Sequence, residues 1–152
     1  MNKKHLSMGL AAVLFASYTI TAFSQAKPET LVRQRQAAMT LQGKYYYPIR
    51  TMAQGKIPYD ANVVARNVAF LEALSKMPWD GFDPNTKGVK SGALPVVYTD
   101  TAKFQDAQKG FEGEVAKLAS VSKGGAEAAV KAQILAIDKS CNNCHETFRE
   151  RN

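Results

Sequence analysis

Cysteine and histidine are scarce in this chain, and the few present lie close together. Its 152 residues include only two cysteines, Cys141 and Cys144, and two histidines, His5 and His145. A zinc site needs about four nitrogen, sulfur or oxygen ligands, so this set is too small. A structural disulfide usually closes a much longer loop than these two cysteines would. A thioredoxin-type redox pair requires a strand before the motif, and the sequence predicts none there.

Long hydrophobic runs are also missing. The apolar run at residues 8–20 is shorter than the ~20 residues that a membrane-spanning helix needs. It follows Lys3, Lys4 and His5 and precedes small and polar residues, which is the layout of a secretory signal peptide. We therefore predict a signal peptide at residues 1–25, cleaved within about two residues of that end. A retained membrane anchor is the alternative.

Blocks of one charge sign are absent as well. The formal net charge is +7, and Lys3 and Lys4 contribute two of these charges. The remaining lysines and arginines are scattered, and no nucleic-acid-binding motif is present. This predicts a soluble exported domain at residues 26–152 that binds neither nucleic acid nor, after cleavage of the leader, a membrane.

Strand patterns are nearly absent, with residues 96–98 as the only short candidate, whereas helical periodicity is strong. The first predicted helix opens at Pro28, and Pro48 should kink it or end its regular part. The second begins at Asp60, a good N-cap, and the third near Thr99 or Asp100. An irregular loop at residues 78–99 precedes the third helix, and a fourth helix follows after Gly124-Gly125. We therefore predict an all-α protein, an antiparallel up-down-up-down four-helix bundle.

The last predicted helix carries a row of residues at helical spacing that includes both cysteines. This core-facing row is Val130, Ile134, Ile137, Cys141, Cys144 and Phe148. Cys141-Asn142-Asn143-Cys144-His145 is the Cys-x-x-Cys-His signature of c-type haem attachment. On a helix these three side chains share one face, so both sulfurs can form thioethers to haem vinyl groups while the imidazole reaches the iron. The haem should then lie inside the bundle. Thioether attachment takes place outside the bacterial inner membrane, which agrees with the leader and predicts a periplasmic protein.

Several segments in this order resemble the cytochrome c′ family across the whole predicted mature chain. Mitochondrial-type cytochromes c differ, because they carry the haem motif near the N-terminus. The matching segments are Arg35-Gln36-Ala37-Ala38-Met39 with Pro48-Ile49, Pro58-Tyr59-Asp60-Ala61, Leu74-Ser75-Lys76-Met77-Pro78-Trp79 with Phe82, and the terminal motif with Phe148-Arg149.

The resemblance implies roles for further residues. His145 would be the proximal ligand of a five-coordinate iron, and Arg149 would lie close to the haem and to that histidine. Arg35 and Gln36 would contact the haem edge, with Arg35 a reasonable propionate partner. The alternatives are ordinary solvent-exposed charges at Arg149 and at the Arg35–Gln36 pair. Four aromatic residues match positions that pack near the haem, namely Trp79, Phe82, Phe104 and Phe111.

Met39 matches the family position that covers the distal side of the haem. Three interpretations remain open: an apolar lid over an open iron, a sixth ligand in a low-spin haem, or core filler pointing elsewhere. The Arg35–Gln36 pair is closer to the high-spin members, which favours the lid.

The function implied by the resemblance is binding of small gases such as NO and CO, with or without electron transfer. The alternative is a low-spin electron-transfer cytochrome ligated by Met39, which would act with a redox partner protein. No distal acid–base pair is evident, so we predict that the protein is not an enzyme such as a peroxidase. A homodimer through the first and second helices is compatible with the sequence.

Overall fold

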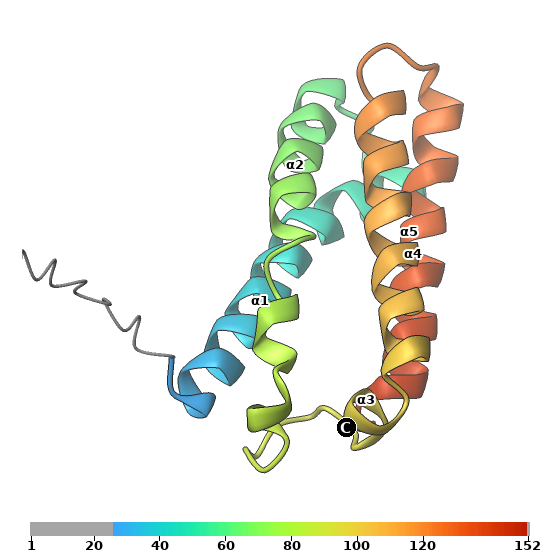
Figure 1. Ribbon diagram of the computed structural model, residues 1–152. Coiled ribbons are helices and arrows are strands. Elements are labelled where there is room, and N and C mark those ends of the chain that lie inside the picture. The colour runs from blue at the N-terminus through green and yellow to red at the C-terminus, as the bar shows by residue number, and fades with distance from the viewer. Residues whose placement is uncertain (1–25, 152) are drawn as a thin grey trace, which may run out of the picture.

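The computed structural model describes residues 26–151, which form a bundle of four long antiparallel helices (Figure 1). The predicted leader at residues 1–25 lies outside the described residues. None of the described helices is long and apolar enough to cross a membrane. The predicted all-α bundle is confirmed, and its long helices are α1 (Pro28–Ala53), α2 (Ala61–Leu74), α4 (Thr101–Val121) and α5 (Glu127–Phe148).

Helix α1 continues through Pro48 to Ala53, so the prediction that this proline could end the regular part of the helix is wrong. Proline removes one backbone donor and crowds the preceding turn. Its neighbours Tyr46 and Ile49 are only 5% and 0% exposed, so packing on both sides holds the chain in the helix.

Helix α2 begins where the sequence predicts. The Asp60 carboxylate accepts hydrogen bonds from the backbone amides of Asn62 and Val63 at 2.9 and 3.1 Å. Such a cap contributes about 1 kcal/mol to helix stability. The helix ends at Leu74, four residues before Pro78.

The connection between α2 and α4 contains three short helical segments, η1 (Trp79–Phe82), η2 (Pro84–Thr86) and α3 (Val96–Thr99). The strand candidate at residues 96–98 is therefore wrong, because Pro95 starts a single helical turn there. The start of this connection packs on the bundle through Trp79. The Trp79 indole donates to the Ser75 carbonyl at 2.8 Å, and its ring meets Phe111 of α4 edge-on.

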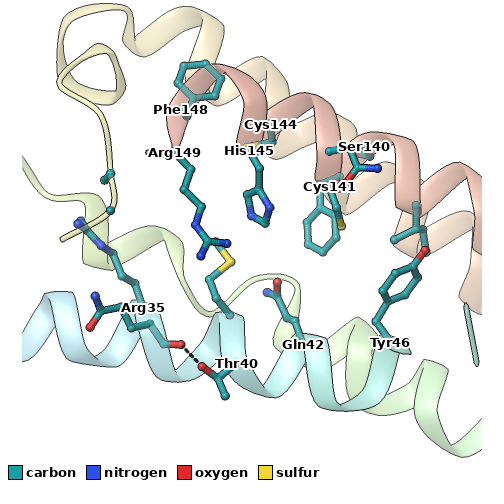
Figure 2. A pocket seen from close by; sticks show the side chains of 18 of the residues that line it. Arg35, Thr40, Gln42, Tyr46, Ser140, Cys141, Cys144, His145, Phe148 and Arg149 are labelled. Carbon is teal, nitrogen blue, oxygen red and sulfur yellow. Dashed lines mark hydrogen bonds between the residues drawn. The ribbon is translucent and has the colours of Figure 1, made fainter. Parts of the chain in front are cut away.

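The core lies between the four helices and ends where α5 presents its cysteines. Val130, Ile134 and Ile137 are 2%, 0% and 0% exposed, whereas Cys141 and Cys144 continue this row but are only half-buried. Helices α1 and α5 make contact in the middle of α5 and separate toward its C-terminal end (Figures 1 and 2). The separation leaves space beside the cysteines.

Candidate functional site

A cavity of about 700 Å³ lies between α1 and α5. Helices α2 and α4 supply its deeper wall through Leu71, Phe104 and Phe111, and the α2–α4 connection supplies Trp79 and Phe82. All four aromatic residues expected near a haem therefore line this cavity. A volume of this size is typical of a cofactor pocket.

Helix α5 presents Cys141, Cys144 and His145 to the cavity (Figure 2). The two thiols form no disulfide. Burial raises the pKa of the Cys141 thiol to about 11, with the negative charge of Asp138 adding to the effect. Burial also raises the pKa of the Cys144 thiol.

The His145 imidazole points from α5 toward α1 (Figure 2). Partial desolvation lowers its pKa, and the positive charge of Arg149 lowers it further. Both effects favour the neutral form of the ring, and this is the form that binds a metal through a ring nitrogen.

Helix α1 forms the opposite wall, and three of its polar side chains there donate hydrogen bonds to backbone carbonyls. The Thr40 hydroxyl donates to the Gln36 carbonyl of its own helix at 2.9 Å. The Gln42 amide donates to the Leu74 carbonyl at 2.9 Å. The Tyr46 hydroxyl donates to the Ile134 carbonyl at 3.0 Å. Met39 is the aliphatic side chain that α1 contributes to this wall.

Arg35 lines the cavity but is not solvent-exposed, so the alternative of a solvent-facing Arg35 is wrong. The side chain is 3% exposed. It donates through Nη1 and Nη2 to the α2–α4 connection, and its guanidinium lies 4.4 Å from the centre of the Phe82 ring. Gln36, in contrast, is exposed at the edge of the cavity.

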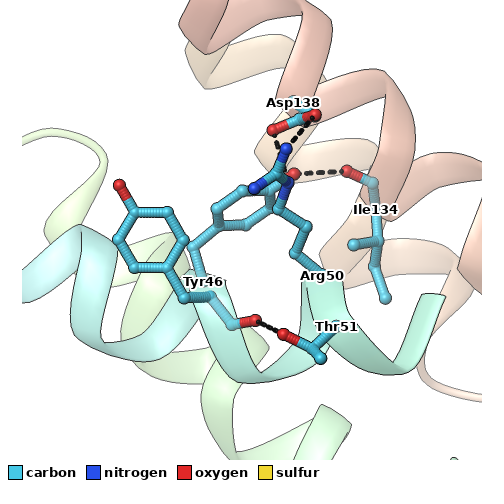
Figure 3. Close-up of polar contacts among 6 residues, drawn as sticks. Tyr46, Arg50, Thr51, Ile134 and Asp138 are labelled. Carbon is cyan, nitrogen blue, oxygen red and sulfur yellow. Dashed lines mark hydrogen bonds and ion pairs between the residues drawn. The ribbon is translucent and has the colours of Figure 1, made fainter. Parts of the chain in front are cut away.

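The sequence analysis missed a polar cluster formed by Tyr46, Arg50 and Asp138. The cluster lies at the end of the cavity where α1 and α5 meet, and we call this end of the cavity the convergent end. Arg50 of α1 and Asp138 of α5 form an ion pair there, with Nε and Oδ1 2.9 Å apart (Figure 3). Tyr46 lies one helical turn before Arg50. The spacing of Met39, Tyr46 and Arg50 on one helix face was the signal available in the sequence.

Arg149 follows the last residue of α5 and is exposed, and its side chain extends from α5 toward α1 beside His145 (Figure 2). Its backbone amide donates to the His145 carbonyl at 3.1 Å, which ends the helix. The structure therefore brings Arg149 and His145 together, as the resemblance implies.

The donor set fits a covalently attached haem better than a bare metal ion. Within residues 26–151, no group of three or more His, Cys, Asp or Glu side chains could hold a metal. Two cysteine sulfurs and one imidazole on a single helix face, beside a large cavity with aromatic walls, match what a c-type haem needs. The residues present therefore fit the group.

Comparisons with known proteins agree with this fit. The family model described as Cytochrome C′ matches residues 30–149. Cytochrome c′ from Rubrivivax gelatinosus is 39% identical over 126 residues, covering 82% of this chain and 98% of the relative. Its crystal structure superposes with a TM-score of 0.78 at 38% identity, with the same coverage of both chains.

Two solved structures of cytochrome c prime from Alcaligenes xylosoxidans are also similar. One is a nitric oxide complex of a variant and the other is a variant with bound carbon monoxide. Each has a TM-score of 0.77 and 32% identity, and covers 83% of this chain and 98% of that chain.

Proposed function

Because this chain belongs to the cytochrome c′ family, we propose that it is a periplasmic haem protein that binds small gases such as NO and CO. Its cofactor is haem c. When bound, this group supplies an iron that changes oxidation state and accepts small axial ligands. The remaining questions concern what the side chains around the cavity do.

Cys141 and Cys144 would hold the haem through two thioethers, and His145 would supply the protein ligand to the iron. These three side chains come from one face of α5, so a single rigid element would fix both the attachment points and the ligand. The lowered pKa of His145, caused by partial desolvation and by the charge of Arg149, supports this assignment.

The attachment can be tested with a double variant, Cys141→Ser and Cys144→Ser. The purified wild-type polypeptide should carry the added mass of one haem after denaturation, and the double variant should carry none. If the variant kept the added mass, the assignment of these sulfurs would be wrong.

One observation favours gas binding over acid–base catalysis. Three polar side chains of the α1 wall, on Thr40, Gln42 and Tyr46, donate to protein carbonyls, and Met39 of the same wall offers an apolar contact to a bound ligand. Because these three donors are already engaged, they are not free to stabilise bound O₂ by hydrogen bonding, and the Met39 side chain supplies no acid or base. The apolar contact suits small uncharged gases.

The second candidate function is electron transfer with Met39 as a sixth ligand. Met39 lines the same cavity as His145, from the opposite helix, which is the observation that favours it. Thioether ligation raises the reduction potential of a haem. A periplasmic redox partner protein would then replace the gas as the binding partner.

Absorption and electron paramagnetic resonance spectra of the purified holoprotein decide between the two. We expect a broad Soret band, a high-spin charge-transfer band and a high-spin ferric signal. Sharp, split low-spin bands together with the far-red band of iron–methionine ligation would contradict the open site and support electron transfer.

A further inference from the structure

Residues 91–94 form a short strap across the end of the cavity opposite the convergent end. Ser91, Gly92 and Ala93 of the strap line the cavity. The strap contacts both α1 and the chain that follows α5, so it connects the two walls of the site.

On the α1 side, the strap is held by Arg35. The Arg35 Nη2 donates to the Ser91 hydroxyl oxygen at 2.7 Å. Its Nη1 donates to the Gly81 carbonyl at 2.5 Å and to the Tyr98 hydroxyl at 3.1 Å. Because a buried guanidinium needs acceptors for its N–H groups, these contacts fix the strap and its flanks relative to α1.

On the α5 side, the strap is held by backbone pairing. The Leu94 amide donates to the Phe148 carbonyl at 2.9 Å, and the Glu150 amide donates to the Gly92 carbonyl at 2.8 Å. Ala93 and Arg149 form an isolated antiparallel bridge between these two bonds. Phe148 and Glu150, which pair with the strap, lie within five positions of His145.

We propose that Ser91 is a positioning residue that fixes the last turn of α5, and with it His145, through the strap. The connection runs from Arg35 to the Ser91 hydroxyl, along the strap backbone, and into the backbone at residues 148–150. The Ser91 hydroxyl also accepts a long hydrogen bond from the Ala93 amide at 3.4 Å, which ties the side chain to the strap itself.

The last turn of α5 has a second anchor, which is a contact between two aromatic side chains. Phe148 is 5% exposed and its ring meets Phe104 edge-on at 5.2 Å. This contact holds the turn against α4, and the strap holds the backbone at residues 148–150. The strap therefore limits how far the end of α5 can shift along the cavity.

This inference rests on the proposed role of His145 as the iron ligand, so its test needs two independent measurements. The first is hydrogen exchange of the Leu94 and Glu150 amides in the holoprotein, which reports whether the strap is held. The second is the iron–histidine stretching band in the resonance Raman spectrum of the ferrous form, which reports the position and strength of the His145 bond.

Three variants separate hydrogen bonding from other effects. Ser91→Ala removes the hydroxyl, Ser91→Thr keeps it, and Ser120→Ala makes the same change as Ser91→Ala at an exposed position of α4. In Ser91→Ala, both amides should exchange about fivefold faster or more, as expected for the loss of one hydrogen bond, and the band should shift or broaden. Ser91→Thr should restore both properties, and Ser120→Ala should match the wild type.

Unchanged exchange in Ser91→Ala would overturn the proposal, as would faster exchange with an unchanged Raman band. Equal effects of Ser91→Ala and Ser91→Thr would assign the change to packing rather than to the hydrogen bond, which also overturns it. Absence of any iron–histidine band in the wild type would instead contradict the proposed role of His145, independently of the strap.

Discussion

Arg50 of α1 and Asp138 of α5 form a two-point ion pair where the two helices converge. Nε lies 2.9 Å from Oδ1, and Nη2 donates to Oδ2 at 3.1 Å. The Nη2 contact is a hydrogen bond, whereas the Nε contact is a close contact between opposite charges that is not a hydrogen bond. Both side chains also line the cavity, so the same contact joins the helices and closes one end of the site.

The ion pair should contribute a measurable coupling energy. Its side chains are 36% and 23% exposed, which leaves them partly screened by solvent. In a double-mutant cycle of Arg50→Gln and Asp138→Asn, we expect a coupling of about 1 kcal/mol in the free energy of unfolding, and less at high salt. The more exposed pair Lys117–Glu114 serves as control and should couple by only ~0.3 kcal/mol. Additive single-variant effects at Arg50 and Asp138 would show that their contact adds no stability.

Tyr46 should make stability sensitive to alkaline pH. Burial of the phenol, and then the negative charge of Asp138, raise its pKa well above the usual value of 10.0. The protonated phenol is therefore favoured in the folded state. Its contribution to the stability of the fold is complete below pH 10 and is lost as the pH rises above that value.

The measurement is the free energy of unfolding by urea as a function of pH. Tyr46→Phe should lower the free energy of unfolding by about 1 kcal/mol at neutral pH, because the hydrogen bond to Ile134 is lost. Above pH 10, the free energy of unfolding of this variant should decline less steeply than that of the wild type. Tyr47→Phe, at a residue that is 61% exposed, should follow the wild-type curve. A Tyr46→Phe curve parallel to the wild type at all pH values would refute this assignment.

Gly81 is required by its close approach to α1. A Cβ atom at this position would lie 2.5 Å from the Arg35 Cβ and 2.7 Å from the Leu31 carbonyl oxygen. Because backbone and a buried side chain must move, Gly81→Ala should destabilise the protein by about 1–3 kcal/mol in thermal or urea unfolding. Gly88→Ala, in the same connection but with open space around it, should change stability by less than about 0.5 kcal/mol. Similar small effects of both substitutions would contradict the close packing of η1 against α1.

Met39 should control access of gas to the site. If it is an apolar lid, Met39→Ala should speed CO binding to the ferrous protein about tenfold or more, which corresponds to ~1.4 kcal/mol off the barrier. Leu41→Ala is the control, because Leu41 lies on the same helix but is 41% exposed. Stopped-flow or flash photolysis measures the rate. A change from low spin to high spin in Met39→Ala would instead identify Met39 as a ligand, and an unchanged rate and spectrum would exclude both roles.

Much of the fold follows from local sequence signals. The helical periodicity of α2, α4 and α5 predicts these elements, and the row that contains Cys141 and Cys144 correctly predicts which face of α5 is inward. The continuation of α1 through Pro48 could not be predicted, because it depends on burial of Tyr46 and Ile49 by other helices. The same holds for the helical turn at residues 96–98, whose β-branched residues have strand propensity but follow Pro95.

The candidate site divides in the same way. The haem-attachment motif is contiguous and can be recognised from residue types and spacing alone. The contacts that close the cavity depend instead on residues far apart in the chain, with Arg35 and Ser91 separated by 56 positions. Nothing in the local sequence of an arginine on α1 reveals that its acceptors will come from a loop after the next helix.

The separation along the chain also sets an order of events during synthesis. The contact between Arg50 and Asp138 spans 88 residues, and the strap pairs with backbone at residues 148–150. Both closures therefore need residues that are translated after α1, α2 and α4. Until those residues emerge, α1 has no partner across the future cavity, and the two thiols arrive together with the contacts that will enclose them.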